Sequence, residues 1–165
     1  SKLEGITSFV SVQPRYNLVF RMIEDELLPL SHAHGLGVIV YNPLAGGVLT
    51  GRYRPGASVE GGTRFGLKNS GAVYQRRYWD DTLFEEVARL ANFFAPRGKS
   101  LTHVALAWVL AQPALTSAIL GASKPDQLRD SIQGVDLKLD DEEMKACDEL
   151  WYNLPRIRDH EIARR

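Results

Sequence analysis

Short apolar runs alternate with longer stretches of helical periodicity along this chain. The clearest run is 37–41, where apolar, largely β-branched residues end just before Pro43. This pattern predicts a strand buried on both faces, because proline lacks the N–H that a ladder needs. Residues 6–13 and 116–120 have the same character and predict two further strands.

Apolar residues at helical spacing fill the stretches between these strands. Residues 23–30 predict a helix that Pro29 bends and Gly35 ends. A second helix is expected at 82–94, where Thr82 and Glu85 have the spacing of a capping box.

Three more helices follow. One begins after Ser100, with its buried stripe on Leu101, Val104, Ala105, Trp108 and Val109. Ser123 is expected to cap the next helix, and Asp140 with Glu143 forms a capping box for the last. Residues 153–165 form a charged C-terminal tail that we expect at the surface.

Strands that alternate with helices indicate parallel βα units, in which ligands bind at the carboxyl ends of the strands. There we expect Gln13, Tyr41 with the glycine-rich loop after it, and residues 121–127 to converge. The loop glycines can let backbone N–H groups turn toward an anion, or they can be simple turn glycines. Likewise, the helix N-terminus beside Lys124 can bind a phosphate, or it can have no ligand, with Ser123 serving only as the helix cap.

Residues 54–79 show no clear period and interleave glycines with Arg54, Arg64, Lys68, Arg76 and Arg77. We expect a lid loop whose cations close over a polyanionic ligand. The alternative is a mobile insertion whose cations face water.

The histidines do not indicate a metal site. His32 and His34 are separated by one residue and point to different faces of a helix, so they are expected at the surface near its C-terminus. His103 is most economically explained by packing rather than catalysis.

Composition narrows the function classes. The chain has 165 residues, 44% of them hydrophobic, and 20 basic residues balance 20 acidic ones. Without a net charge, nucleic acid is an unexpected partner. The single cysteine and the lack of a long apolar run argue against a disulfide framework and a membrane span, so the cytoplasm is the expected compartment.

Four motifs follow one another at 13–17, 41–53, 104–110 and 119–128. In this order they resemble the aldo-keto reductase superfamily, with the greatest likeness to potassium-channel β-subunit-like members and bacterial general-stress reductases. The resemblance implies a (β/α)₈ barrel that binds NADP(H) across the carboxyl ends of its strands. It identifies the chain as the C-terminal half of that domain, an α/β partial TIM barrel with strands 6–8 and their helices.

By this resemblance, Gln13 hydrogen-bonds the nicotinamide carboxamide and Tyr41 stacks on its ring. Fourteen residues are expected to bind the cofactor: Gln13, Tyr41, Asn42, Pro43, Leu44, Ala45, Gly47, Arg52, Arg64, Gly121, Ser123, Lys124, Gln127 and Asp130. Among them, the loop residues and the two arginines are expected to bind the pyrophosphate. Gly121, Ser123 and Lys124 are expected to hold the adenosine 2′-phosphate. Many relatives have Glu-Asn where this chain has Asp130 and Ser131, which would weaken an adenine contact.

No segment matches the catalytic Asp, Tyr, Lys and His motifs of the family, so we expect no catalytic residue here. A closed barrel of this class needs about 250 residues, and we therefore expect a fragment of a longer reductase of small carbonyl compounds. Two alternatives are open: a non-catalytic NADP(H)-sensing regulatory subunit, and an inert fragment without a ligand. A homo-oligomer or a channel-type partner is compatible both with the reductase and with the regulatory subunit.

Overall fold

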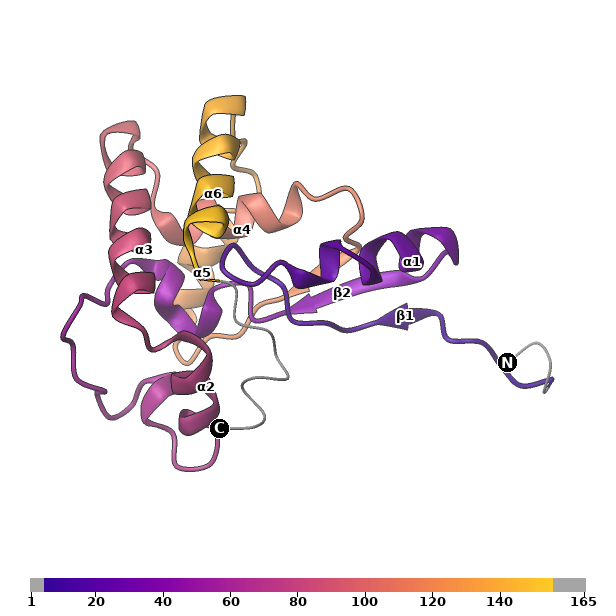
Figure 1. Cartoon of the computed structure of the whole chain (residues 1–165), viewed down its shortest axis with the longest axis horizontal. Helices are drawn as coiled ribbons and strands as arrows, with labels where there is room; N and C mark the ends of the chain where they lie inside the picture. Colours follow the sequence, from indigo (N-terminus) through magenta and orange to yellow (C-terminus); the bar gives the residue numbers. More distant parts are fainter. Residues whose placement is uncertain (1–4, 156–165) are drawn as a thin grey trace.

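The computed structural model describes residues 5–155. Three parallel strands form one sheet in the order β1 (Ser11–Val12), β2 (Gly37–Tyr41) and β3 (Ser117–Ile119). In Figure 1, β1, β2 and α1 extend to the right of the other helices. The prediction of an α/β chain built from parallel βα units is confirmed, while the numbering of these strands within a barrel stays a prediction.

The register places the strand ends at one edge of the sheet. Ser11 pairs with Gly37, and Tyr41 pairs with Ile119. Because all three strands run in the same direction, the segments that leave their carboxyl ends share that edge. This is the geometry that the expected ligand site requires.

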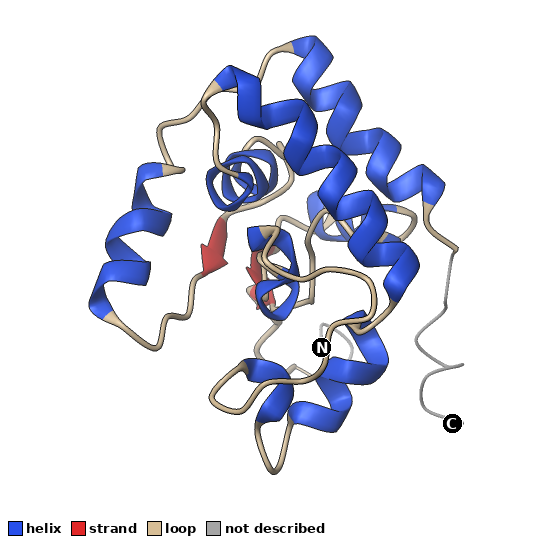
Figure 2. Cartoon of the chain, turned by 90° about the vertical axis from the view of Figure 1, so that its left-hand side faces the viewer, coloured by secondary structure: helices blue, strands red, loops and turns tan. Residues whose placement is uncertain are grey.

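Helices surround the strands, as Figure 2 shows. In the described part of the chain the α-helices are α1 (Leu27–Ala33), α2 (Gly71–Tyr78), α3 (Asp81–Phe94), α4 (Leu101–Leu110), α5 (Pro125–Gln133) and α6 (Asp141–Asn153). The 3₁₀ segments are η1 (Met22–Glu24), η2 (Ala45–Thr50), η3 (Arg64–Gly66) and η4 (Ala95–Arg97). None of these helices is long and apolar enough to cross a bilayer.

The hydrophobic core lies between the sheet and the α3, α4 and α6 helices. The five residues expected on the α4 stripe are all buried, and Trp108 is fully enclosed. The expected start of α4 is also confirmed, because the Ser100 side chain accepts a hydrogen bond from the His103 N–H. At α6, Asp140 and Glu143 form the expected capping box.

An aromatic cluster holds the middle of the chain against this core. The Tyr53 ring packs against Phe65, Trp79 and Phe84 at centroid distances of 5.3, 5.2 and 5.7 Å. Phe65 and Trp79 are 4.8 Å apart. Because these rings come from four separate segments, they tie η3, α2 and α3 to the end of the β2 loop.

β2 has its predicted bounds, whereas β1 and β3 were predicted in the right place but too long. β1 covers only residues 11–12, and Ile6, Phe9 and Val10 before it are exposed. The reason is the register: β2 begins at Gly37 opposite Ser11, so earlier residues have no paired partner strand beside them. β2 buries Val38 and Val40 but not Ile39, which corrects the expectation of burial on both faces. β3 is likewise mostly exposed rather than buried.

The helix expected at 23–30 is divided in two. Met22–Glu24 forms η1, and α1 begins only at Leu27. Pro29 therefore falls in the first turn, where a missing N–H costs no intrahelical hydrogen bond, and it does not bend the helix.

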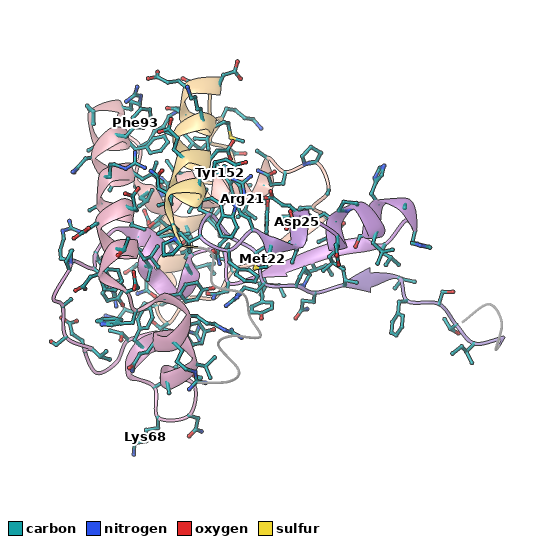
Figure 3. All side chains as sticks on the ribbon, viewed as in Figure 1. Arg21, Met22, Asp25, Lys68, Phe93 and Tyr152 are labelled. Carbon is teal, nitrogen blue, oxygen red and sulfur yellow. The ribbon has the colours of Figure 1, made fainter. Side chains whose placement is uncertain are left out.

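Residues 54–79 are more ordered than a long loop. They contain η3 and the eight-residue helix α2. The period was hidden because α2 buries only Gly71 and Tyr78 and carries arginine and glutamine between them. Lys68 lies at the outer tip of the loop beside α2 in Figure 3. The lid role of this segment stays a prediction.

Two predicted helix caps were wrong. Asp80, not Thr82, caps α3 by accepting a hydrogen bond from the Leu83 N–H. Lys124, not Ser123, is the N-cap residue of α5, and no side chain caps that helix. For each helix the predicted and the observed cap residue lie only one or two positions apart, so both fit the spacing of a helix start. The direction of the backbone where the chain enters the helix decides which residue is the cap.

Candidate functional site: a cleft at the carboxyl edge of the sheet

A cleft of about 600 Å³ opens where the strands end. Its walls come from the end of β2, from η2, from the segment around η3, from α2, and from the residues that join β3 to α5. Eleven of the fourteen residues predicted from the sequence line it: Tyr41, Asn42, Pro43, Leu44, Gly47, Arg52, Arg64, Gly121, Ser123, Gln127 and Asp130. Their role in holding a cofactor is a prediction that this geometry permits.

Three predicted residues do not line the cleft. The register continued from Val12 and Val38 sets Gln13 level with Ile39, below Tyr41, and its side chain is exposed. Ala45 is fully buried beneath the loop. Lys124 is exposed at the N-cap of α5, outside the lining.

The loop after β2 is held in an unusual conformation. Asn42 and Ala45 have positive φ angles of 63° and 50°, and Gly46 and Gly47 have 69° and 101°. A positive φ is costly for alanine, and such strain persists where the surrounding structure over-determines it. Non-glycine residues of this kind concentrate at ligand-binding loops.

The glycines of this loop serve the turn itself, which is the second of the two interpretations that the sequence left open. The N–H groups of Ala45 and Gly47 donate to the carbonyls of Asn42 and Leu44, and the Gly46 N–H donates to Asn42 Oδ1 at 2.8 Å. These donors are therefore satisfied within the loop rather than aimed at an anion. Gly46 instead permits close approach, since a Cβ there would lie 2.8 Å from Tyr74 Cδ1.

Two guanidinium groups supply the positive charge of the cleft. Arg64 packs over the Tyr74 ring at 5.3 Å, and its Nη2 lies 3.9 Å from the position that a Cβ of Gly121 would take. It thus reaches from η3 to the loop after β3. Arg52 stacks over Tyr53 at 4.6 Å and donates to the Tyr53 hydroxyl at 2.5 Å. Held in this way, both arginines can meet an anion with little loss of side-chain freedom.

The N-terminus of α5 forms the opposite end of the cleft. Because no side chain caps this helix, its first turn keeps the positive end of the helix dipole open to a ligand. The Ser123 N–H and hydroxyl both donate to Gln127 Oε1 at 3.0 Å. These two donors can serve a phosphate once the Gln127 amide turns away.

His103 and Asp130 pair beside the cleft. The His103 Nε2 atom lies 3.1 Å from Asp130 Oδ1, which joins α4 to α5. The expectation that His103 packs rather than catalyses stays a prediction. Among the described residues, no group of three or more His, Cys, Asp or Glu side chains could hold a metal ion.

Sequence reasoning missed several lining residues. Tyr74 and Thr63 come from the segment where no period was found, and Thr102 comes from a helix position predicted only as structure. Ser131 also lines the cleft, although the sequence marked it as a position where an adenine contact would be weakened. Tyr74 and Tyr78, four residues apart with Arg76 and Arg77 between them, were the one signal that could have located α2 and its cleft-facing ring.

The chain is similar in sequence to several known proteins. The chain is 39% identical over 126 residues to a probable voltage-gated potassium channel subunit beta of Oryza sativa subsp. japonica, which covers 76% of this chain and 38% of that protein. Over 142 residues it is 34% identical to the uncharacterized oxidoreductase YrpG of Bacillus subtilis, covering 86% and 40%. Over 133 residues it is 35% identical to aflatoxin B1 aldehyde reductase member 2 of Rattus norvegicus, covering 73% and 36%.

The chain therefore spans about two fifths of the length of the curated relatives that it matches. A model of the aldo/keto reductase family matches residues 1–152, which is most of the chain. The parallel sheet, the cleft at its carboxyl edge and this match lead to one conclusion: the chain belongs to the aldo/keto reductase family.

Proposed function

We propose that this chain supplies the NADP(H)-binding half of an oxidoreductase that reduces aldehydes or ketones. The observation that supports it most directly is the single cleft in which an aromatic ring, two guanidinium groups and an uncapped helix N-terminus come together. Its volume of about 600 Å³ lies within the range of small-molecule sites. The family and the oxidoreductases named among the relatives agree with this proposal.

The residues present fit a nicotinamide dinucleotide. Tyr41 offers a ring face for the nicotinamide, and Gln13, on the same face of the sheet, is proposed to reach its carboxamide. Asn42, Pro43, Leu44, Ala45 and Gly47 form the loop against the pyrophosphate, whose charge Arg52 and Arg64 offset. At the far end, Gly121, Ser123, Lys124, Gln127 and Asp130 are proposed to hold the adenosine and its 2′-phosphate.

When bound, the cofactor supplies the hydride that reduces the carbonyl carbon. The chain's own task is to orient the nicotinamide and to compensate the phosphate charge. We propose that the acid that protonates the carbonyl oxygen lies in the portion of the relatives that this chain does not span, so that the chain alone does not turn over substrate.

The test is a fluorescence titration of the chain with NADPH and with NADH, repeated on Lys124→Ala. We expect the wild type to bind NADPH more tightly, and the variant to lose about fivefold to tenfold in NADPH affinity with little change for NADH, because one cation beside a phosphate is removed. Lys145→Ala, an exposed lysine on α6, is the matched control. An equal loss for both cofactors contradicts the 2′-phosphate contact, and no binding of either contradicts the proposed function.

The channel β-subunit relatives suggest a rival role as a redox-sensing subunit. No contact in the cleft favours it over the reductase. Turnover of a model aldehyde by a protein of the relatives' full length separates the two, since a sensor would show little or none.

A further inference from the structure

A buried polar junction lies directly behind the cleft. Asn17, from the segment after β1, is fully buried and donates from Nδ2 to the Asn42 carbonyl at 2.9 Å. The same nitrogen donates to the Tyr78 hydroxyl at 3.2 Å. Asn42 donates from its own Nδ2 to that hydroxyl at 3.0 Å. One hydroxyl on α2 thus accepts hydrogen bonds from both asparagine amides.

The Tyr78 hydroxyl sets the orientation of the Asn42 amide. Asn42 Oδ1 accepts the Gly46 N–H at 2.8 Å, so its nitrogen must point the other way and needs an acceptor there. Tyr78 provides that acceptor. Burial raises the pKa of Tyr78, so the hydroxyl stays protonated at neutral pH, and the Arg15 guanidinium 5.7 Å from its ring opposes that rise.

The junction therefore determines the shape of the loop after β2. Asn42 sits at a φ of 63°, and the hydrogen bond to Gly46 closes the turn that Gly46 and Gly47 continue. If the Asn42 amide lost its partner on Tyr78, a partly buried donor would lose its acceptor, and the amide could rotate and release Gly46. The loop would then leave the conformation that forms one wall of the cleft.

We propose that Tyr78 is a positioning residue for the cofactor: it touches no ligand, but through Asn42 it holds the loop at 42–47 in its binding conformation. Tyr78 does not line the cleft, and no sequence motif pointed to it. This inference rests on the proposed function, because it concerns the affinity for the nicotinamide cofactor.

The experiment compares Tyr78→Phe with the wild-type chain by two measurements. Amide hydrogen exchange should be about tenfold faster at Gly46, while the amides of the buried helix α4 change much less. NADPH affinity, measured by fluorescence, should fall by about fivefold to tenfold, as the binding-competent loop becomes less populated. The control is Tyr152→Phe, which removes a hydroxyl from an exposed tyrosine on α6, labelled in Figure 3, and should change neither value.

A second variant distinguishes positioning from general destabilisation. Asn42→Gly keeps a residue suited to a positive φ but removes the amide through which Tyr78 acts. If the inference is right, adding Tyr78→Phe to Asn42→Gly weakens NADPH binding little further, because the two residues act as one unit. Additive losses would refute it.

The outcomes separate this inference from the proposed function. Equal acceleration of exchange at Gly46 and in α4, or an unchanged NADPH affinity in Tyr78→Phe, refutes the role of Tyr78 even if the wild type binds NADPH. Absence of NADPH binding by the wild type refutes the proposed function, and the exchange rate at Gly46 still decides whether Tyr78 holds the loop.

Discussion

The contact between α4 and α5 depends on the absence of one side chain, at Gly134. Its backbone is right-handed, with φ −71° and ψ −13°, so alanine could adopt this conformation without strain. An added Cβ, however, would lie 2.8 Å from His103 Cα and 3.0 Å from the His103 carbonyl oxygen. These are backbone atoms of a buried helix and cannot rotate aside. Gly134→Ala therefore tests the close approach of α5 to α4 without adding backbone strain.

The expected cost follows from these distances. Restoring an ordinary contact requires α5 to move by about 0.6 Å from α4, and such overpacking costs about 1–3 kcal/mol. For a chain of this size the melting temperature should fall by roughly 2–12 °C. Because α5 carries Gln127 and Asp130 in the cleft, NADPH should also bind more weakly.

Thermal unfolding followed by circular dichroism measures this effect. The matched control is Gly61→Ala, since Gly61 has no positive φ and no atom lies within 4 Å of the position that its Cβ would take. That variant should be neutral or slightly stabilised through the entropy of the unfolded chain. If Gly134→Ala is as stable as Gly61→Ala, the helices do not rely on this close approach and the reasoning is wrong.

Two further predictions concern titration and capping. Burial, with Asp148 and Glu143 nearby, raises the pKa of the Cys147 thiol to about 12 from 9.0, so unfolding releases a proton between these values and stability falls as pH rises above 9, by up to about 1.4 kcal/mol per pH unit. Denaturation of wild type and Cys147→Ala at several pH values isolates this slope, and parallel curves contradict it. Asp80→Ala should lose about 1 kcal/mol of unfolding free energy and Thr82→Ala almost none, because Asp80 is the residue that accepts the Leu83 N–H. Urea denaturation of both variants measures this difference. A larger loss in Thr82→Ala would show that Thr82 caps α3 after all.

Local signals predicted the elements that depend on local interactions. β2 was placed at its observed bounds by an apolar run ending at Pro43. α4 and α6 were placed by Ser100 and Asp140, whose side chains accept hydrogen bonds from their own helices. In each case the deciding contact lies within four residues, so a single sequence contains it.

The misses in β1, in α2 and at Tyr78 depend on contacts that a local periodic pattern does not contain. The extent of β1 is set by where β2 begins, and α2 starts at Gly71, where a Cβ would lie 2.4 Å from the Phe65 carbonyl oxygen. Neither the register nor this approach leaves a periodic mark in the sequence. The same holds for Tyr78, whose two amide partners lie 61 and 36 residues away.

The loop after β2 lines the cleft, and its hydrogen bonds decide between the two interpretations of its glycines. Its glycines could either free backbone donors for an anion or serve the turn alone, and Ala45, Gly46 and Gly47 use their N–H groups within the turn. A loop that satisfies its own donors can be rigid before a ligand arrives, which lowers the ordering cost of binding. For the proposed NADP(H) site, the positive charge that offsets the phosphates must therefore come from side chains and from the open end of α5. Arg52 and Arg64, both packed on tyrosine rings, and the uncapped first turn beside Lys124 are the groups that meet this requirement.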